Sequence, residues 1–204
     1  MRLLIATSTA LIPLLLLMLI TPPAVAQEKG FALRGQVEIA GSVSYASITP
    51  VSNGTTGDAT SIFSFGPQIA YFIVDGFAIG FNPGITILPG ITIVTPTSGD
   101  NTTLTQLFFY PEYNLRLEGS KAVPFVEVPL GYTSSSSGGS TASGFSWGVK
   151  AGVKIVAAGH LLLTIYGEYL AIALNPDNTS PYSTSSGRTG LNYLSFGIGV
   201  GGFF

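Results

Sequence analysis

Polar and apolar side chains alternate along residues 104–118. The polar set on one parity is Gln106, Glu112, Asn114, Arg116 and Glu118, and the apolar set on the other is Leu107, Phe109, Tyr113, Leu115 and Leu117. Successive side chains of a β-strand point to opposite faces, so this pattern predicts a strand with one polar and one apolar face. A membrane-spanning β-barrel accommodates both faces, because lipid covers the apolar side and the lumen encloses the charges.

Similar alternating segments recur along the chain and are separated by connections of two kinds. We predict eight strands, at residues 31–49, 61–73, 77–88, 103–118, 123–133, 144–156, 161–174 and 191–204. Three connections are tight turns, at residues 74–76, 119–122 and 157–160, and four are long and polar, at 50–60, 89–102, 134–143 and 175–190. Short turns at one end and long loops at the other are typical of an outer-membrane barrel.

The parity of each predicted strand assigns nine charged residues to the lumen. They are Arg34, Glu38, Glu112, Arg116, Glu118, Glu127, Lys150, Lys154 and Glu168. A cationic side chain on the lipid face costs about 2–4 kcal/mol at the membrane midplane, whereas lumen charges can pair with one another. Four cations against five anions favour a cross-linked interior over a pore that selects one sign of charge. Trp147, on the opposite parity, is expected to face lipid.

A soluble β-sandwich is the main alternative to the barrel, and the composition disfavours it. Only 9% of residues are charged and the mean hydropathy is +0.49, against about 25% charged residues in soluble domains. The solvent-facing sides of a sandwich would carry too few charges. After residue 26, no run of about 18 residues is apolar throughout, so membrane-spanning helices are not expected. The chain has no cysteine and must be stable without disulfides.

The N-terminal residues have the pattern of a secretory signal peptide. Arg2 precedes a largely apolar stretch, and Ala24-Val25-Ala26 is a small-residue cleavage site. A retained anchor helix is the alternative, but Pro13 and Pro22 disfavour it. We therefore expect a signal peptide at residues 1–26 and one barrel domain at residues 27–204.

The chain resembles the small outer-membrane β-barrel family of OmpA/OmpX type over nearly all of residues 27–204. The resemblance rests on Gly41-Ser42-Val43-Ser44-Tyr45, on Pro124-Phe125-Val126-Glu127 leading to Leu130-Gly131-Tyr132, and on the closing strand that ends in Phe204. It implies an all-β, eight-stranded antiparallel up-and-down transmembrane barrel in the bacterial outer membrane. It also implies that Phe204 belongs to the signal read by the barrel-assembly machinery, and that outer-membrane lipids and lipopolysaccharide surround the barrel.

No catalytic, cofactor-binding or metal-binding residues are expected. The segment 197–202 matches G-x-G-x-x-G, but only Phe203 and Phe204 follow, where a dinucleotide site needs a helix. His160, the only histidine, lies in a predicted tight turn without a nearby serine, and the absence of cysteine disfavours a metal site. A weakly acidic chain offers no electrostatic basis for binding nucleic acid.

These observations favour a monomeric barrel with a structural role in the envelope or a role in surface contacts. Two alternatives remain: a small channel for ions or modest solutes and, as the less favoured of the two, a lipid A-modifying enzyme.

Overall fold

The computed structural model describes residues 30–52, 55–88, 102–137, 140–176 and 189–204. The predicted signal peptide lies outside these ranges, and none of them contains a helix long and apolar enough to cross a membrane. The strands are β1 Val37–Ser52, β2 Thr55–Thr56, β3 Thr60–Val74, β4 Phe77–Leu88, β5 Thr102–Asn114, β6 Ala122–Glu127, β7 Leu130–Ser137, β8 Ser140–Ala158, β9 Leu161–Pro176 and β10 Thr189–Phe203.

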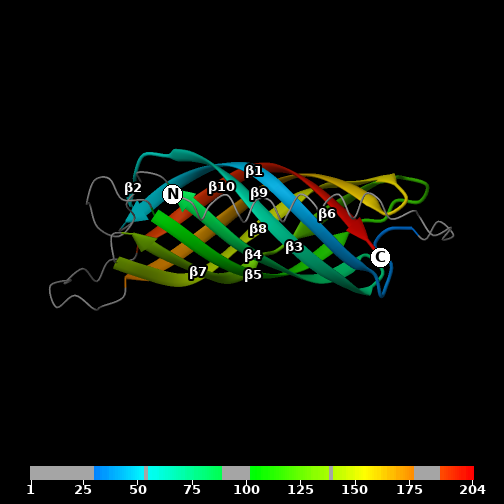
Figure 1. Cartoon of the computed structure of the whole chain (residues 1–204), viewed down its shortest axis with the longest axis horizontal. Helices are drawn as coiled ribbons and strands as arrows, with labels where there is room; N and C mark the ends of the chain where they lie inside the picture. Colours follow the sequence, from blue (N-terminus) through cyan, green and yellow to red (C-terminus); the bar gives the residue numbers. More distant parts are fainter. Residues whose placement is uncertain (1–29, 53–54, 89–101, 138–139, 177–188) are drawn as a thin grey trace, which may run out of the picture.

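The strands form one closed antiparallel barrel, because β10 pairs with β1 along its whole length, from Glu38–Phe203 to Ser52–Thr189. β6 and β7 form a single stave, since both pair with β5 and β8 in the same register, and the short β2 pairs only with the end of β1. Eight staves therefore follow one another up and down around the ring (Figure 1). The predicted eight-stranded, up-and-down, antiparallel barrel is confirmed.

The exterior of the barrel is apolar because one parity of every stave carries large hydrophobic side chains. Phe63 is 77% exposed, Phe109 62% and Trp147 49%, as expected for a lipid-facing belt. Tyr45 and Tyr132 lie on this face and donate their hydroxyl groups to Ser61 and Ser143 at 2.7 and 2.6 Å. A tyrosine with an apolar ring and a hydrogen-bonded hydroxyl suits the rim of such a belt.

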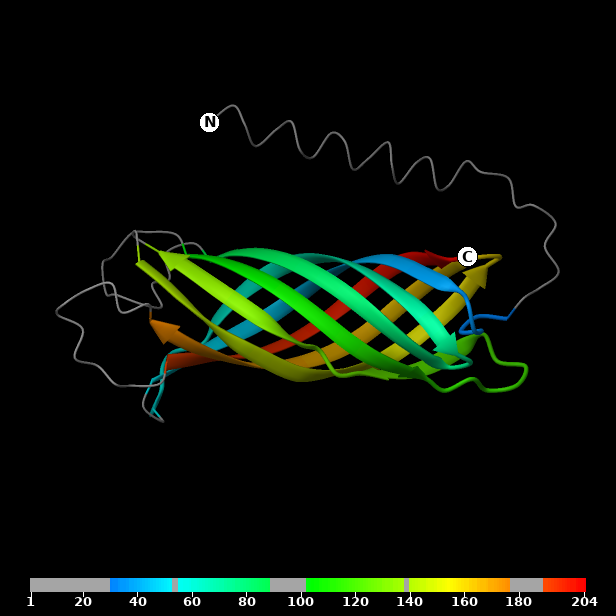
Figure 2. The same cartoon turned by 90° about the horizontal axis from the view of Figure 1, so that it is seen from below.

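Three glycines with positive φ shape the tight turns at one end of the barrel, which we call the short-turn end. They are Gly76 (φ 78°), Gly119 (φ 72°) and Gly159 (φ 51°). A residue without a Cβ adopts this conformation without steric cost. The start of the described chain and the C-terminus also lie at this end (Figure 2). The opposite end is the long-loop end.

Three predicted boundaries are wrong. The first strand begins at Val37 and not at residue 31, and β5 stops at Asn114, whose partner in β6 is Phe125, and not at residue 118. The predicted long loop at residues 134–143 is largely strand, because β7 and β8 continue to the Ser137–Ser140 pair. Composition alone had indicated a loop.

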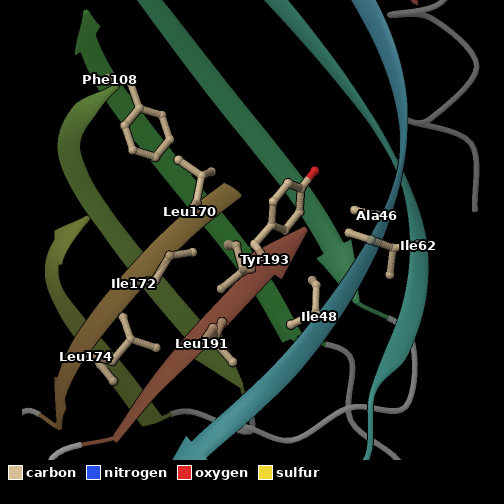
Figure 3. Packing of buried hydrophobic residues seen from close by; sticks show 11 residues of the cluster. Ala46, Ile48, Ile62, Phe108, Leu170, Ile172, Leu174, Leu191 and Tyr193 are labelled. Atoms are coloured by element: carbon tan, nitrogen blue, oxygen red, sulfur yellow. The ribbon is translucent and has the colours of Figure 1, made fainter. Parts of the chain in front are cut away.

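The interior is filled in layers. An inner apolar cluster at the short-turn end contains Phe31, Ala32, Ala70, Phe72, Ala78, Tyr110, Val123, Leu162 and Phe203. An outer apolar cluster toward the long-loop end contains Ala46, Ile48, Ile62, Leu104, Phe108, Ala142, Leu170, Ile172, Leu174, Leu191 and Tyr193, and Figure 3 shows these side chains converging from separate strands. Charged and polar side chains occupy the space between the two clusters.

Candidate functional site

Lys154 of β8 is the centre of an ionic layer inside the barrel. Its Nζ lies 2.7 Å from Glu38 Oε2 of β1 and 2.6 Å from Glu112 Oε1 of β5, and all three side chains have no solvent exposure. The ammonium group also faces the ring of Phe125 at 5.0 Å from its centroid. One lysine thus joins three staves across the lumen.

Lys150, four residues before Lys154 on the same face of β8, makes a second bridge. Its Nζ lies 3.0 Å from Glu127 Oε2 of β6 and donates a 3.0 Å hydrogen bond to Gln68 Oε1 of β3. The same group lies 4.7 Å from the centroid of the Tyr166 ring. Lys150 and Glu127 are also neighbours in the β6–β8 register, so the fold itself brings this pair together.

Glu168 is the remaining charged residue of the layer, and its environment differs from that of the other carboxylates. It lies opposite Lys150 in the β8–β9 register, but no ion pair among the described residues includes it. Its Oε2 accepts a hydrogen bond from Ser195 Oγ at 3.3 Å. The described lumen therefore holds four glutamates and two lysines, whereas the sequence predicted nearly equal numbers of anions and cations.

The ionic layer stabilises the barrel only if its charged groups have partners, because an uncompensated buried ion costs several kcal/mol. Asn114 Nδ2 donates to Glu112 Oε1 at 2.6 Å, which adds a neutral donor to the Lys154 pair. Within the described residues, Glu38 Oε1 and Glu112 Oε2 have no hydrogen-bond partner. Removal of Lys154 would leave two carboxylates facing each other without a counter-charge.

Three of the nine residues predicted to lie in the lumen do not lie there. Arg34 and Glu118 are exposed, and Arg116 forms an exposed ion pair with Asp75, at 3.2 Å between Nη1 and Oδ2. The cause is the length of the strands, since alternation directs a side chain into the lumen only while the backbone remains in the sheet. The structure places Glu38, Glu112, Glu127, Lys150, Lys154 and Glu168 inside the barrel.

Residues 30–36 close the short-turn end, a role that the sequence interpretation missed. Phe31 is 5% exposed and packs against Phe72 and Phe203, with ring centroids 5.4 and 5.2 Å apart. Gly76 N donates to Ala32 O, and Gly35 N donates to Phe72 O, both at 2.8 Å. Gly35, with φ 85°, interrupts the alternation and was the available signal for a turn before β1.

A polar cavity of about 50 Å³ lies between the ionic layer and the outer cluster. Its polar lining comes chiefly from Ser42, Ser64, Asn82, Gln106, Glu168 and Tyr193, contributed by six different strands. Few of these side chains carried a functional signal in the sequence, since they are small polar residues on the interior parity. The cavity exceeds the volume needed for one water molecule, roughly 10–15 Å³.

His160 lies in the turn before β9 and contacts the end of the chain. Its ring stacks on Phe204, at 6.2 Å between centroids and 13° between planes, and meets Phe203 edge-on at 5.1 Å. No described contact brings a serine to it. Phe204 itself is hydrogen-bonded to Val37 through both of its backbone groups, so it completes the β1–β10 closure.

Neither of the other motifs weighed in the sequence forms a site in the described structure. Residues 197–202 lie inside β10, where no helix follows the glycines. The described part of the chain contains no group of three or more His, Cys, Asp or Glu residues arranged to hold a metal ion.

Comparison with known proteins identifies the fold. No family model matches the sequence, and no curated protein does. Among solved structures, the chain is similar to the outer membrane protein OprG from Pseudomonas aeruginosa, with a TM-score of 0.61, 14% identity, and coverage of 84% of this chain and 97% of that one. The chain has the fold of a small bacterial outer-membrane β-barrel.

Two further outer-membrane proteins match less closely. The Neisserial surface protein NspA gives a TM-score of 0.48 at 17% identity, covering 79% of this chain and 96% of that chain. The N-terminal β-barrel domain of Pseudomonas aeruginosa OprF gives 0.45 at 16%, covering 80% and 97% respectively. The apolar exterior, the closed sheet and the OprG-like fold together describe an integral outer-membrane protein.

Proposed function

We propose that this chain is a non-catalytic outer-membrane barrel whose interior is a structural plug, with a role in envelope integrity or in surface contacts. The observation that carries the proposal is the filling of the lumen at successive levels. Phe31 blocks the short-turn mouth, Lys154 ties β1, β5 and β8 together without solvent exposure, and the outer cluster fills the far end. An open pore requires a continuous water-filled path along the lumen, and each of these layers interrupts that path.

The charge pattern of the lumen supports the same proposal. The two lysines are held by carboxylates of other staves at 2.6–3.0 Å, so their charge is used inside the protein. In a selective channel, such charges would interact with the passing ions instead. Surface contacts would then fall to the connections at the long-loop end, since the exterior of the barrel is covered by lipid.

Three partner assignments belong to this proposal. Outer-membrane lipids and lipopolysaccharide would surround the apolar belt, the barrel-assembly machinery would act during biogenesis, and the folded protein would be a monomer. The apolar belt supports the first of these, and the position of Phe204 in the closing strand pair supports the second.

A planar-bilayer recording of the purified, reconstituted barrel tests the proposal. We expect little or no steady conductance from the wild-type protein, and equally little from Phe31→Ala, because the ionic layer and the outer cluster remain in place. Steady conductance of the wild type that increases in Phe31→Ala would contradict the plug and show that the barrel is a channel. Turnover of lipid A by the purified protein would instead favour the enzyme.

The channel remains a second candidate because of one observation, the polar cavity beside Glu168. To form a channel, this cavity would need to extend past Tyr193 and the leucines of the outer cluster to the long-loop end. Leu191→Gly combined with Leu174→Gly removes side chains at that barrier, and conductance appearing only in this variant would locate the closed gate there.

A further inference from the structure

Three neighbouring staves carry a block of hydroxyl groups on the outer face of the barrel, near the long-loop end. The strands are β5, β7 and β8, and their register aligns the side chains in two rows of three. The row nearer the membrane centre is Thr105, Ser134 and Ser143, and the row beyond it is Thr103, Ser136 and Thr141. We call these residues the hydroxyl block. They have the same parity as the exposed Leu107, Tyr132 and Phe145, so they face outward.

Most of the hydroxyl block has no hydrogen-bond partner within the protein. Ser143 Oγ accepts a hydrogen bond from the Tyr132 hydroxyl at 2.6 Å. In the described part of the chain, no side-chain hydrogen bond includes any of the other five residues. Thr105, Ser136 and Thr141 are also exposed. Because a hydroxyl group both donates and accepts, the block can form several hydrogen bonds with a molecule outside the barrel.

The hydroxyl block lies at the level of the lipid head groups. On β8, the outward-facing apolar side chains extend from Phe145 to Ile155. Between these residues, a strand that advances about 3.3 Å per residue and is tilted by about 40° rises roughly 25 Å, the height of the apolar band of an outer-membrane barrel. Ser143 and Thr141 are the next outward-facing residues and therefore lie just above the band. Long loops face the cell exterior in such barrels, so the block meets the outer leaflet.

The surroundings of the hydroxyl block carry no positive charge in the described structure. Its lysines and arginines are Lys150 and Lys154 in the lumen, and Arg34, Arg116 and Lys121 at the short-turn end. In the sequence, residues 89–101 before β5 and residues 138–139 between β7 and β8 also contain no lysine or arginine. Phosphate groups are bound chiefly by such cations. The block is therefore suited to the uncharged hydroxyl and amide groups of a ligand.

Below the hydroxyl block, the same three staves present apolar side chains to the membrane. The first row is Leu107, Tyr132 and Phe145, and the second row is Phe109, Leu130 and Trp147. All of these side chains are between 41% and 62% exposed. The outer surface of the three staves is therefore polar and uncharged above, and apolar and largely aromatic below. This order matches an amphiphile with an uncharged polar head.

We propose that the hydroxyl block binds the sugar head of an outer-leaflet glycolipid, whose acyl chains lie against the two apolar rows. Adjacent strands lie about 4.8 Å apart and alternate residues of one strand about 7 Å apart, so the block measures roughly 10 by 7 Å, a size that two linked sugar rings cover. The inference rests on the contact with lipopolysaccharide proposed above. It assigns that contact to the sugars of the glycolipid and not to its phosphates.

A comparison of lipids on the wild-type barrel tests the proposal. The whole barrel is placed in phosphatidylcholine nanodiscs, and lipid bound to it is counted by native mass spectrometry. The probes are lipid A, lipid A stripped of its phosphates, and phosphatidylglycerol, which is anionic and has no sugar. We expect both forms of lipid A to bind one-to-one, with affinities within threefold of each other and at least tenfold tighter than that of phosphatidylglycerol.

Two outcomes would overturn the glycolipid site. Tenfold weaker binding after removal of the phosphates would show that the barrel recognises the phosphates, and equal binding of phosphatidylglycerol would show that it does not distinguish sugars from other head groups. A planar-bilayer recording of the same preparation separates this test from that of the plug. Steady conductance contradicts the plug alone, whereas loss of the preference for lipid A without conductance contradicts the glycolipid site alone.

A matched pair of double variants locates the binding. Thr105→Val with Ser134→Ala removes two hydroxyl groups from the block with little change in volume, and it should weaken binding of dephosphorylated lipid A at least fivefold. The control is Thr49→Val with Ser47→Ala on the outer face of β1, across the barrel from β7, and it should leave binding unchanged. Equal affinity of the two variants would refute the block as the site. The wild-type comparison of lipids decides the proposal if either variant fails to fold.

Discussion

The two halves of the barrel are stabilised in different ways. In the inner half, from the short-turn end to the ionic layer, every stave is paired to its neighbours and lysines join opposite walls. In the outer half, the β3–β4 ladder is interrupted, a cavity remains open, and aliphatic side chains fill the lumen without polar partners. The inner half is therefore held together by polar contacts across the lumen, whereas the outer half depends chiefly on the burial of apolar side chains.

Loss of the central lysine should have the largest effect. Lys154→Met leaves Glu38 and Glu112 buried without their counter-charge, and we expect a decrease in the free energy of unfolding on the order of 3–5 kcal/mol. Reversible urea unfolding in micelles measures it. Adding Glu38→Gln and Glu112→Gln to Lys154→Met should recover part of the loss. A negligible change in the single variant would mean that the layer is hydrated.

The outer cluster should respond as an ordinary apolar core. Leu191 is 1% exposed, and Leu191→Ala should lower the free energy of unfolding by about 2–5 kcal/mol through lost burial and the remaining cavity. The exposed Leu194 of the same strand faces lipid, so Leu194→Ala in the same unfolding experiment serves as control and should cost less. If Leu194→Ala costs as much, then the outer cluster does not pack as described.

A pair of glycines compares the packing at the ionic layer with the packing beside the polar cavity. A Cβ at Gly152 would collide with the backbone carbonyl oxygen of Ile165, whereas a Cβ at Gly84 makes only ordinary contacts with Gln106. Gly152→Ala should destabilise by roughly 1–3 kcal/mol, and Gly84→Ala by less than about 0.5 kcal/mol. Thermal unfolding of both variants under one condition measures the difference, and a reversed order would contradict the comparison.

The exposed ion pair should have the smallest effect. Arg116 and Asp75 have side chains 40% and 59% exposed, and such pairs contribute about 0–1 kcal/mol. Arg116→Ala should therefore change the unfolding midpoint little, and added salt should reduce the difference further. A loss comparable to that of Lys154→Met would show that Arg116 has a structural role that its exposure does not indicate.

Alternation along the chain was sufficient to predict the barrel, because lipid outside and an enclosed lumen inside impose a strict period of two. It also assigned Lys150, Lys154 and their glutamates to the interior parity. It failed for Arg34 and Arg116, since parity carries no information about where a strand leaves the sheet. The Phe31 closure and the interrupted β3–β4 ladder depend on contacts between distant residues. Gly35, Pro67 and Pro83 are local signals of irregular backbone, but they do not encode the partners in those contacts.

The hydrogen bonds between Val37 and Phe204 also constrain the order of assembly. Seven of the eight stave contacts join consecutive segments and can form as hairpins while the chain is still being delivered. The eighth joins the first stave to the last, so no partial chain can close the ring. Contacts between such distant residues form slowly, because a long loop must first be closed. Barrel closure is therefore a late, all-or-none event, and until it occurs two strand edges must be shielded from the edges of other chains.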